Sequence, residues 1–314
     1  MYYIGVDVGG TGLKAGVVDE KGTILAKESC PTGVERGYEA VIRDIAGLCT
    51  TVASQVVHDM DEVASIGIGL PGIYVPSTGM VPFCTNLGWH DVPLKAEMAK
   101  YTSRPIFADN DATVAGLAEA VAGVSAHVSN SIFVTLGTGV GGGIIIGGKP
   151  FSGPHGIASE IGHMITVAGG ELCTCGNRGC WERYASATAI IREGRKYAML
   201  HPDCAIARAV NGNLDEITAR TVIDLAKEGD GPANALFDEY IEHLCIGLVN
   251  LINLYDPEII VLGGGVSHAG QFLLDKVNAQ LPKLVFYKSM PYATVALAQL
   301  GNDAGIIGAA MLGK

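Results

Sequence analysis

Apolar and polar positions alternate in blocks along the first thirty residues. Three apolar runs are separated by turns at 9–12 and 20–22, which are rich in glycine or charged residues. Short apolar runs bounded by such turns are typical of antiparallel strands. We therefore expect the chain to open with a three-stranded meander, with strands at 2–8, 13–19 and 24–29.

After this meander the pattern switches between helical spacing and short continuous apolar runs. Helical spacing predicts helices at about 38–58, 111–119, 188–199, 221–227, 232–255 and 304–312. Short apolar runs predict strands at 63–69, 105–108, 131–136, 140–146, 259–262 and 294–298. We expect a loop-rich stretch around Asn86-Leu87-Gly88-Trp89 and a polar, cysteine-bearing insertion from Gly153 to about Glu182.

The two halves of the chain resemble each other weakly. Each opens with an apolar strand, a turn of glycine and threonine, and a second strand; the turns are Gly9-Gly10-Thr11-Gly12 and Gly137-Thr138-Gly139. The economical interpretation is a duplicated α/β unit, with the two copies facing each other across a cleft. No low-complexity linker separates them, and we place the boundary near Asp111.

Composition narrows the class of ligand. A length of 314 residues suits two domains that each bury a core. The net charge of −11 argues against binding to nucleic acid or an anionic membrane, because phosphate groups are bound by clustered Lys and Arg. A neutral sugar fits this charge. A nucleotide also fits, provided that backbone N–H groups and a metal hold its phosphates.

The sequence predicts a cytoplasmic protein. No segment is long and apolar enough to cross a bilayer, and no signal peptide is recognisable. Three of the eight cysteines lie within eight residues, which indicates a metal site in a reducing compartment. We interpret the other five cysteines as scattered small hydrophobic residues: Cys30, Cys49, Cys84, Cys204 and Cys245.

Three glycine-rich turns are candidate nucleotide-binding loops, since such turns free N–H groups and let the backbone approach a phosphate. Either of the first two turns alone is better explained as an ordinary hairpin, whereas the pair together with Asp7 and the third turn favours a nucleotide. Two turns would clamp the phosphates of ATP and the third would meet its adenosine. Asp7 is expected to hold Mg²⁺, and Lys14 to reach a phosphate. The candidate residues are Asp7, Gly9, Gly10, Thr11, Gly12, Lys14, Gly137, Thr138, Gly139, Gly263, Gly264 and Gly265.

The cysteine cluster is the most specific signal in the sequence. Cys173, Cys175 and Cys180 offer three thiolates on a glycine-punctuated loop, and His163 can complete a Cys₃His site of the structural zinc type. Three unliganded thiols in a polar loop would be prone to oxidation, and the sequence offers nothing apolar to bury them.

Two carboxylates flank the cluster. Glu160 precedes His163 by three residues, and Glu182 follows Cys180 by two. A bound metal would fix both carboxylates and the second imidazole nitrogen, and such a rigid polar set suits the hydroxyls of a sugar. The alternative is that each glutamate is a solvated surface charge.

Asp111 is the candidate general base. It lies where a strand ends and a helix begins, in Asp109-Asn110-Asp111-Ala112, and an aspartate at such a place commonly caps the helix. Phosphoryl transfer to a hydroxyl needs a positioned carboxylate to accept the proton. Capping and catalysis therefore remain alternatives here, and Asn110 beside it suits adjacent sugar hydroxyls.

Together these motifs resemble the ROK family (repressors, open reading frames and kinases) of the actin-like ATPase superfamily. The resemblance spans essentially the whole chain. It is most specific at Glu160-Ile-Gly162-His163 and at Cys173-x-Cys175-Gly-x-x-Gly-Cys180-x-Glu182. The other matching motifs are Asp7-Val-Gly9-Gly10-Thr11-x-x-Lys14, Leu70-Pro71-Gly72, Asn86-Leu-Gly-Trp89, Asn110-Asp111-Ala112 and Leu136-Gly-Thr-Gly-Val-Gly-Gly-Gly143.

The resemblance implies two actin-like (RNase H-like) domains, 1–111 and 112–302, with the C-terminal helix at 303–314 returning to the first. It implies an ATP-dependent hexokinase, with glucose favoured over N-acetylmannosamine, N-acetylglucosamine or fructose, in a homodimer or homotetramer. Asp111 would take the proton of the 6-hydroxyl. The other implied roles are sugar binding by Asn110, Glu160, His163, Glu182 and Gly72 (or Gly69), and zinc ligation by His163, Cys173, Cys175 and Cys180.

Two other functions are weighed against this one. The family's repressors carry a DNA-binding segment before the first phosphate motif, and only six residues precede Asp7, so we expect no repressor. The second alternative is a sugar sensor without turnover. Such a protein would not need Asp111 and both candidate phosphate turns, so their presence favours the kinase.

Overall fold

The computed structural model describes residues 1–314, which form two compact units. Unit 1 comprises Met1–Phe133, Gly143–Ser159 and Ala298–Lys314, and unit 2 comprises Val134–Gly142 and Glu160–Leu297. The C-terminal segment Ala298–Lys314 packs within unit 1.

The compact units divide the chain differently from the expected domains. Residues 112–133 and 143–159 pack with unit 1, because helix α3 (Asp111–Ala122) lies against helix α10 (Ala304–Met311). The domain boundaries near Asp111 and at 302 therefore stay a prediction.

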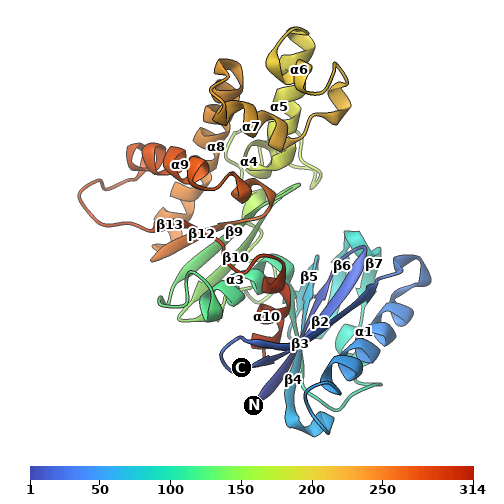
Figure 1. Ribbon diagram of the computed structural model, residues 1–314. Helices are drawn as coiled ribbons and strands as arrows, with labels where there is room; N and C mark the ends of the chain where they lie inside the picture. Colours follow the sequence, from blue (N-terminus) through green and yellow to red (C-terminus); the bar gives the residue numbers. More distant parts are fainter. The chain divides into compact units, whose positions relative to one another are not determined.

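Unit 1 is built on a five-stranded sheet in the order β3-β2-β1-β4-β8. The first three strands are antiparallel, which confirms the meander, and β4 and β8 add in parallel. Figure 1 shows this sheet between its helices. The strands are β1 (Tyr2–Val8), β2 (Gly12–Asp19), β3 (Ile24–Pro31), β4 (Val63–Leu70) and β8 (Ile106–Asn110).

Alternation along β1 decides which helix covers which face of this sheet. Ile4, Val6 and Val8 pack with helix α1 (Tyr38–Ala53) in one buried cluster. Tyr3 lies on the opposite face, in a second cluster with α3 and α10. Period-two alternation of this kind is what a strand buried on both faces requires.

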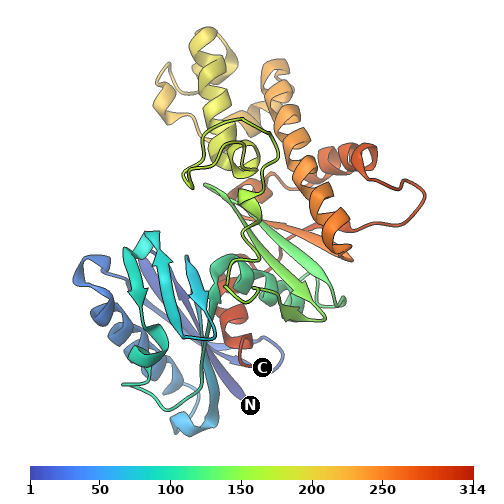
Figure 2. The ribbon, with the colours of Figure 1, turned by 180° about the vertical axis from the view of Figure 1, so that it is seen from behind.

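The stretch expected to be loop-rich holds a small sheet instead. Strands β5 (Ile73–Val75), β6 (Met80–Cys84) and β7 (Trp89–Val92) pair in the order β5-β6-β7. Figure 2 shows this small sheet, in cyan, from behind. A short helix, α2 (Leu94–Met98), follows it. The prediction was wrong because strands of three to five residues are too short to show a period.

The second five-stranded sheet repeats the order of the first. Its strands run β11-β10-β9-β12-β13, which is again third, second, first, fourth and fifth along the chain. This repetition supports the duplication inferred from the turns. The strands are β9 (Ser131–Leu136), β10 (Val140–Ile146), β11 (Lys149–Pro150), β12 (Ile259–Gly263) and β13 (Thr294–Leu297).

Unit 2 carries most of the helices. The longest is α8, whose start is capped by Asp230 and followed by Pro232 in its first turn. Helices α6 and α9 were not predicted, and Pro282 inside α9 interrupts its helical signal. No helix of the chain is long and apolar enough to cross a membrane. The helices are α4 (Glu182–Ala185), α5 (Ala187–Leu200), α6 (Ala205–Ala209), α7 (Ala219–Lys227), α8 (Gly231–Tyr255) and α9 (Gln271–Leu284).

Candidate active site

The first glycine-rich turn joins β1 to β2, and a hydrogen bond from the side chain of Thr32 supports it. The N–H of Gly9 donates to the carbonyl of Gly12 at 2.9 Å, and the fully buried Thr32 donates its hydroxyl to the carbonyl of Gly9 at 2.6 Å. The turn is therefore fixed before any ligand binds. Thr32 follows β3 and carries no motif, so sequence analysis did not single it out.

Asp7 and Lys14 lie opposite each other in the β1–β2 ladder, as the hairpin register requires. Asp7 Oδ2 lies 3.6 Å from Lys14 Nζ. Burial raises the pKa of the Asp7 carboxyl above its ordinary value, and the Lys14 ammonium lowers it in part. A partly buried carboxylate paired with one lysine is suited to bind a hard cation such as Mg²⁺.

The second phosphate turn joins β9 to β10 within unit 2. The N–H of Gly137 donates to the carbonyl of Gly139 at 3.0 Å, and the Thr188 hydroxyl donates to the carbonyl of Thr138 at 2.7 Å. A Cβ on Gly139 would lie 2.6 Å from Glu182 Oε2. The structure therefore brings this turn beside Glu182, a contact that the sequence does not reveal.

The third turn, after β12, crosses directly over the end of β9. Gly264 has φ +80°, and a Cβ there would lie 2.6–2.8 Å from backbone atoms of Leu136. The turn borders a cavity of about 370 Å³ that is wholly within unit 2. The side chains lining this cavity include Arg220, Ile223, Asp224, Lys227, Val266 and His268.

We expect Gly264→Ala to lower the free energy of unfolding by about 2 kcal/mol or more, since the new methyl group meets backbone and the φ is unfavourable. Urea unfolding measures this loss. Gly265→Ala is the matched control, because a Cβ on Gly265 meets nothing within 4 Å. Equal stability of the two variants would contradict this account of the turn.

The candidate base, Asp111, directly follows the carboxyl end of strand β8. Asn110 is the N-cap of α3, and its Oδ1 accepts from the N–H of Ala112 at 2.9 Å. Asp111 begins the helix and is exposed, although its Oδ1 also accepts from the N–H of Ala112 at 2.8 Å. Asn110 thus fills the capping role, which leaves the carboxylate of Asp111 at the surface of unit 1.

Asp109 is tied down by two hydrogen bonds. It accepts from Ser152 Oγ at 2.6 Å and from the N–H of Asn110 at 2.8 Å. Burial raises the pKa of its carboxyl, and the two hydrogen bonds lower it in part. Both oxygens of Asp109 accept hydrogen bonds, so Asp109 anchors the strand end. Asp111 is the more exposed of the two carboxylates and the better candidate to contact a substrate.

Gly72 lies beside this strand end. Its carbonyl accepts from Asn110 Nδ2 at 3.3 Å, and a Cβ on it would lie 2.7 Å from Cys84 Cβ. The buried Cys84 thiol donates to the carbonyl of Pro71 at 3.3 Å, and burial raises the pKa of this thiol to about 11. Cys84 therefore supports the Pro71-Gly72 turn as a neutral donor.

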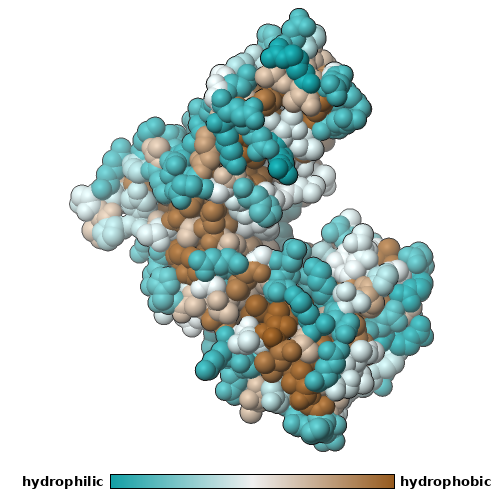
Figure 3. Space-filling model, viewed as in Figure 1, coloured by the Kyte–Doolittle hydropathy of each residue, from teal (hydrophilic) through white to brown (hydrophobic).

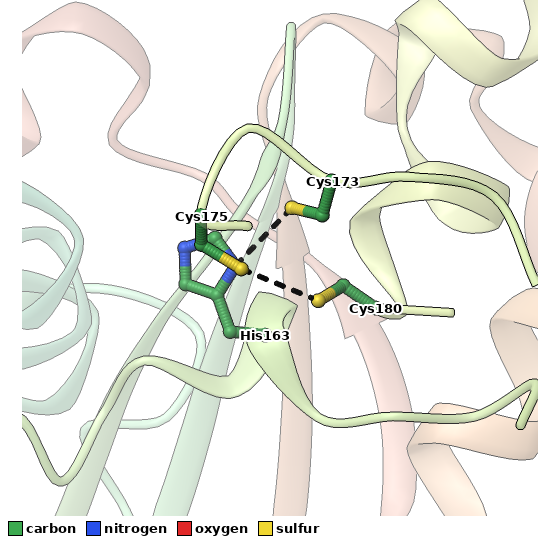
Figure 4. Close-up of side chains that lie close together, drawn as sticks. All are labelled: His163, Cys173, Cys175 and Cys180. Carbon is green, nitrogen blue, oxygen red and sulfur yellow. Dashed lines mark hydrogen bonds between the residues drawn. The ribbon is translucent and has the colours of Figure 1, made fainter. Parts of the chain in front are cut away.

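The four predicted metal ligands converge in unit 2. The ligand atoms of His163, Cys173, Cys175 and Cys180 all lie within 4.8 Å of one another (Figure 4). Cys173 Sγ is 3.7 Å from His163 Nδ1, and Cys175 Sγ is 3.6 Å from Cys180 Sγ. Tetrahedral ligands about 2.3 Å from zinc lie about 3.8 Å apart, so the cluster is compatible with a zinc site.

The loop that presents these ligands folds back on itself. Gly176 and Gly179 have φ values of +92° and +85°, which confirms the expected tight path. The expectation that nothing apolar buries the thiols was wrong for two of them. Cys173 and Cys180 are 3% and 0% exposed, and backbone bridges at Leu172–Arg178 and Ile165–Cys180 join parts of the loop that carries them.

The carboxylates lie on either side of His163. Glu160 Oε2 is 4.0 Å from His163 Nε2, and Glu182 Oε1 is 3.9 Å from His163 Nδ1. Glu182 Oε1 also accepts from the Cys173 thiol at 3.0 Å. Because Nδ1 faces the cysteines, a bound metal would leave Nε2–H free to donate to a ligand beside Glu160.

The structure thus assembles the predicted residues in two groups. Asp7, Lys14, Gly72, Asn110 and Asp111 belong to unit 1, with the first turn. The metal ligands, Glu160, Glu182 and the other two turns belong to unit 2. Sequence analysis missed the supporting residues Thr32, Ser152 and Thr188, since a hydroxyl that bonds to a distant segment leaves no local pattern.

Known proteins match the whole chain. The model of the ROK family matches residues 3–314. A glucokinase of Halalkalibacterium halodurans is 36% identical over 100% of this chain and 95% of its own length. A glucokinase of Thermotoga maritima is 37% identical over 99% of this chain and 96% of its own length.

A solved structure agrees with these relatives. The ROK family glucokinase from Streptomyces griseus, solved with glucose and AMPPNP, has a TM-score of 0.80 and 36% identity, and covers 99% of both chains. Both sheets and their helices fit the two-domain actin-like kinase fold of that relative. The chain therefore belongs to the ROK family.

Proposed function

We propose that this chain is a glucokinase that transfers the γ-phosphoryl group of ATP to the 6-hydroxyl of glucose. The observation that carries the proposal is the convergence of His163, Glu160 and Glu182 around the four-ligand cluster, in a chain similar to glucokinases over its full length. A rigid set of one donor and two carboxylates suits the vicinal hydroxyls of a hexose.

A zinc ion held by His163, Cys173, Cys175 and Cys180 would organise this set. A bound zinc would be ligated by thiolates, so Cys173 would no longer donate to Glu182 Oε1, and this oxygen would be available to a sugar hydroxyl. The same ion would fix the ring of His163, so that His163 Nε2–H and Glu160 could bind hydroxyls from one side.

Asp111 would act as the general base. Its carboxylate accepts the proton of the 6-hydroxyl, the oxygen forms its bond to the γ-phosphorus, and the bond to the β,γ-bridging oxygen breaks to release ADP. Mg²⁺, when bound at Asp7, neutralises charge on the phosphates. The N–H groups of the glycine turns bind the phosphate oxygens, and Asn110, already fixed through Gly72, binds a neighbouring hydroxyl.

The cavity beside Gly265 suits the adenosine part of ATP. Ile223 and Val266 offer buried apolar surface for a base, while Asp224 and His268 offer polar groups. The cavity adjoins the third glycine turn, which lies against the end of β9, one residue before the second phosphate turn. This continuity would place adenosine and phosphates along one path in unit 2.

We expect Gly265→Val to raise the KM for ATP by about tenfold or more, because its side chain would occupy space that the base needs. The glucose KM and the unfolding midpoint should stay unchanged, since a Cβ there meets nothing in the free protein. Steady-state kinetics with each substrate varied in turn measure both constants. An unchanged KM for ATP would move adenosine out of this cavity.

ADP release against a panel of sugars tests the substrate. Glucose, mannose, fructose, N-acetylmannosamine and N-acetylglucosamine are each added with Mg·ATP to the zinc-loaded protein. We expect the highest kcat/KM with glucose. A higher value with an N-acetyl sugar or fructose would assign the chain to another kinase of the family, and release with none would favour a sugar sensor.

We propose a homo-oligomeric cytoplasmic enzyme. Reduced cysteines that bind a metal suit a reducing compartment. The segment between α9 and β13 exposes Phe286, Tyr287 and Met290, which are 85%, 57% and 58% accessible. Hydrophobic residues also gather in patches on the face shown in Figure 3. Such surface favours burial against a second copy, and light scattering after gel filtration measures the mass.

A further inference from the structure

A buried carboxylate lies in the helix that begins with Asp111. Glu119 is 1% exposed and sits two turns further along α3. A buried glutamate is costly unless hydrogen bonds compensate for its lost hydration, so its partners reveal why it is there. No part of the proposed reaction uses it.

Three backbone N–H groups donate to this carboxylate. Val124 donates to Oε2 at 2.9 Å, while Gln299 and Leu300 donate to Oε1 at 2.8 Å and 2.9 Å. The two sets of donors are about 175 residues apart in sequence, and Glu119 is the group that they share. Gly123 leaves the necessary room, since a Cβ on it would lie 2.0 Å from Glu119 Oε2.

The donors belong to two segments of unit 1 that are far apart in the sequence. Val124 starts the segment that leaves α3, and the chain first passes into unit 2 after Phe133. Gln299 and Leu300 follow the last passage, at Leu297–Ala298, and lead into α10. One side chain therefore ties the segment after α3 to the segment before α10, both within unit 1.

We propose that Glu119 is a positioning residue that clasps these two segments of unit 1 and so holds helix α3, whose first residue is Asp111, in place when substrates bind. The proposal rests on the proposed kinase function, in which Asp111 and the sugar-binding groups come from different units. A loosened clasp would misplace Asp111 relative to the phosphoryl acceptor and admit water. Water would then take a fraction of the phosphoryl groups, which yields ADP and inorganic phosphate.

Glu119→Gln is the direct test. Glutamine keeps the shape and can accept from Gln299 and Leu300, but its NH₂ group then faces the N–H of Val124, so one of the three hydrogen bonds is lost. Leu117→Val is the matched control, because Leu117 is buried in the same helix and none of these hydrogen bonds involves its side chain.

We expect Glu119→Gln to lower kcat by about tenfold while the glucose KM changes less than threefold. The ratio of ADP released to glucose 6-phosphate formed should rise clearly above one. Leu117→Val should keep the ratio at one, even at the same loss of unfolding midpoint. A Glu119→Gln enzyme with wild-type kcat and ratio, or one that matches Leu117→Val, would overturn the proposal.

Amide hydrogen exchange supplies a readout that needs no turnover. In the wild type we expect the amides of Val124, Gln299 and Leu300 to be protected together, both with and without glucose and AMPPNP. Exchange of these amides at the rate of exposed loops would refute the clasp even if the variant failed to fold. Absence of phosphorylation by the wild type would instead contradict the proposed function and leave the exchange result interpretable.

Discussion

Asp111→Asn should lower kcat for glucose phosphorylation by about 10²–10⁴-fold, the range for loss of a general base. The amide has nearly the same shape and can still accept the hydrogen bond from Ala112 N–H, so α3 should remain intact. The KM for ATP should change little, because the substitution leaves Asp7 and the glycine-rich turns unchanged. Coupled kinetics with varied ATP and glucose measure these constants.

Asp109→Asn is the neighbouring control. An asparagine there can still pair with Ser152 and with the N–H of Asn110, which hold the native carboxylate. We expect less than a tenfold loss of kcat from this variant. If Asp109→Asn lost as much activity as Asp111→Asn, or if Asp111→Asn kept most of it, the base would be misassigned.

Cys175→Ser should abolish zinc binding and raise the glucose KM by about 10–100-fold, the usual effect of disturbing a metal site and its supporting residues. Cys175 is the exposed ligand of the four, so its replacement costs no core packing. The loss instead follows from the loop, because the ligands, Glu182 and His163 share contacts that a metal would fix. Metal analysis by mass spectrometry and steady-state kinetics measure the two effects.

Cys204→Ser separates metal loss from thiol loss. Cys204 caps helix α6 through its Sγ, outside the cluster, and serine is a better N-cap. This variant should keep its zinc and its glucose KM. The account of the pocket fails if the purified wild type contains no zinc under reducing conditions, or if Cys175→Ser loses zinc and keeps its glucose KM.

The strands and helices of the two sheets were largely predictable, because long apolar runs and helical spacing carry strong signals. The helix start at Asp111 was found in this way, whereas β8 continues to Asn110, two residues beyond the expected strand end at Ala108. The small sheet was missed because its strands are short, and α9 because a proline interrupts it.

The site was predictable where its residues cluster in sequence. The four metal ligands lie within eighteen residues of one another, so spacing alone indicated them. Hydrogen bonds between segments far apart in the sequence could not be predicted from local patterns. Examples are those of Thr32 with Gly9, of Ser152 with Asp109, and of Glu119 with residues 299–300. These contacts depend on the folded path of the backbone, which local sequence patterns do not specify.

The identity of the product is the most direct test of the central claim. The zinc-loaded wild type is incubated with Mg·ATP and glucose, and the products are examined by phosphorus NMR. We predict stoichiometric ADP and a single sugar phosphate whose phosphorus couples to the protons on C6. Absence of any sugar phosphate from folded, zinc-loaded protein, or a phosphate on another carbon, would contradict the account.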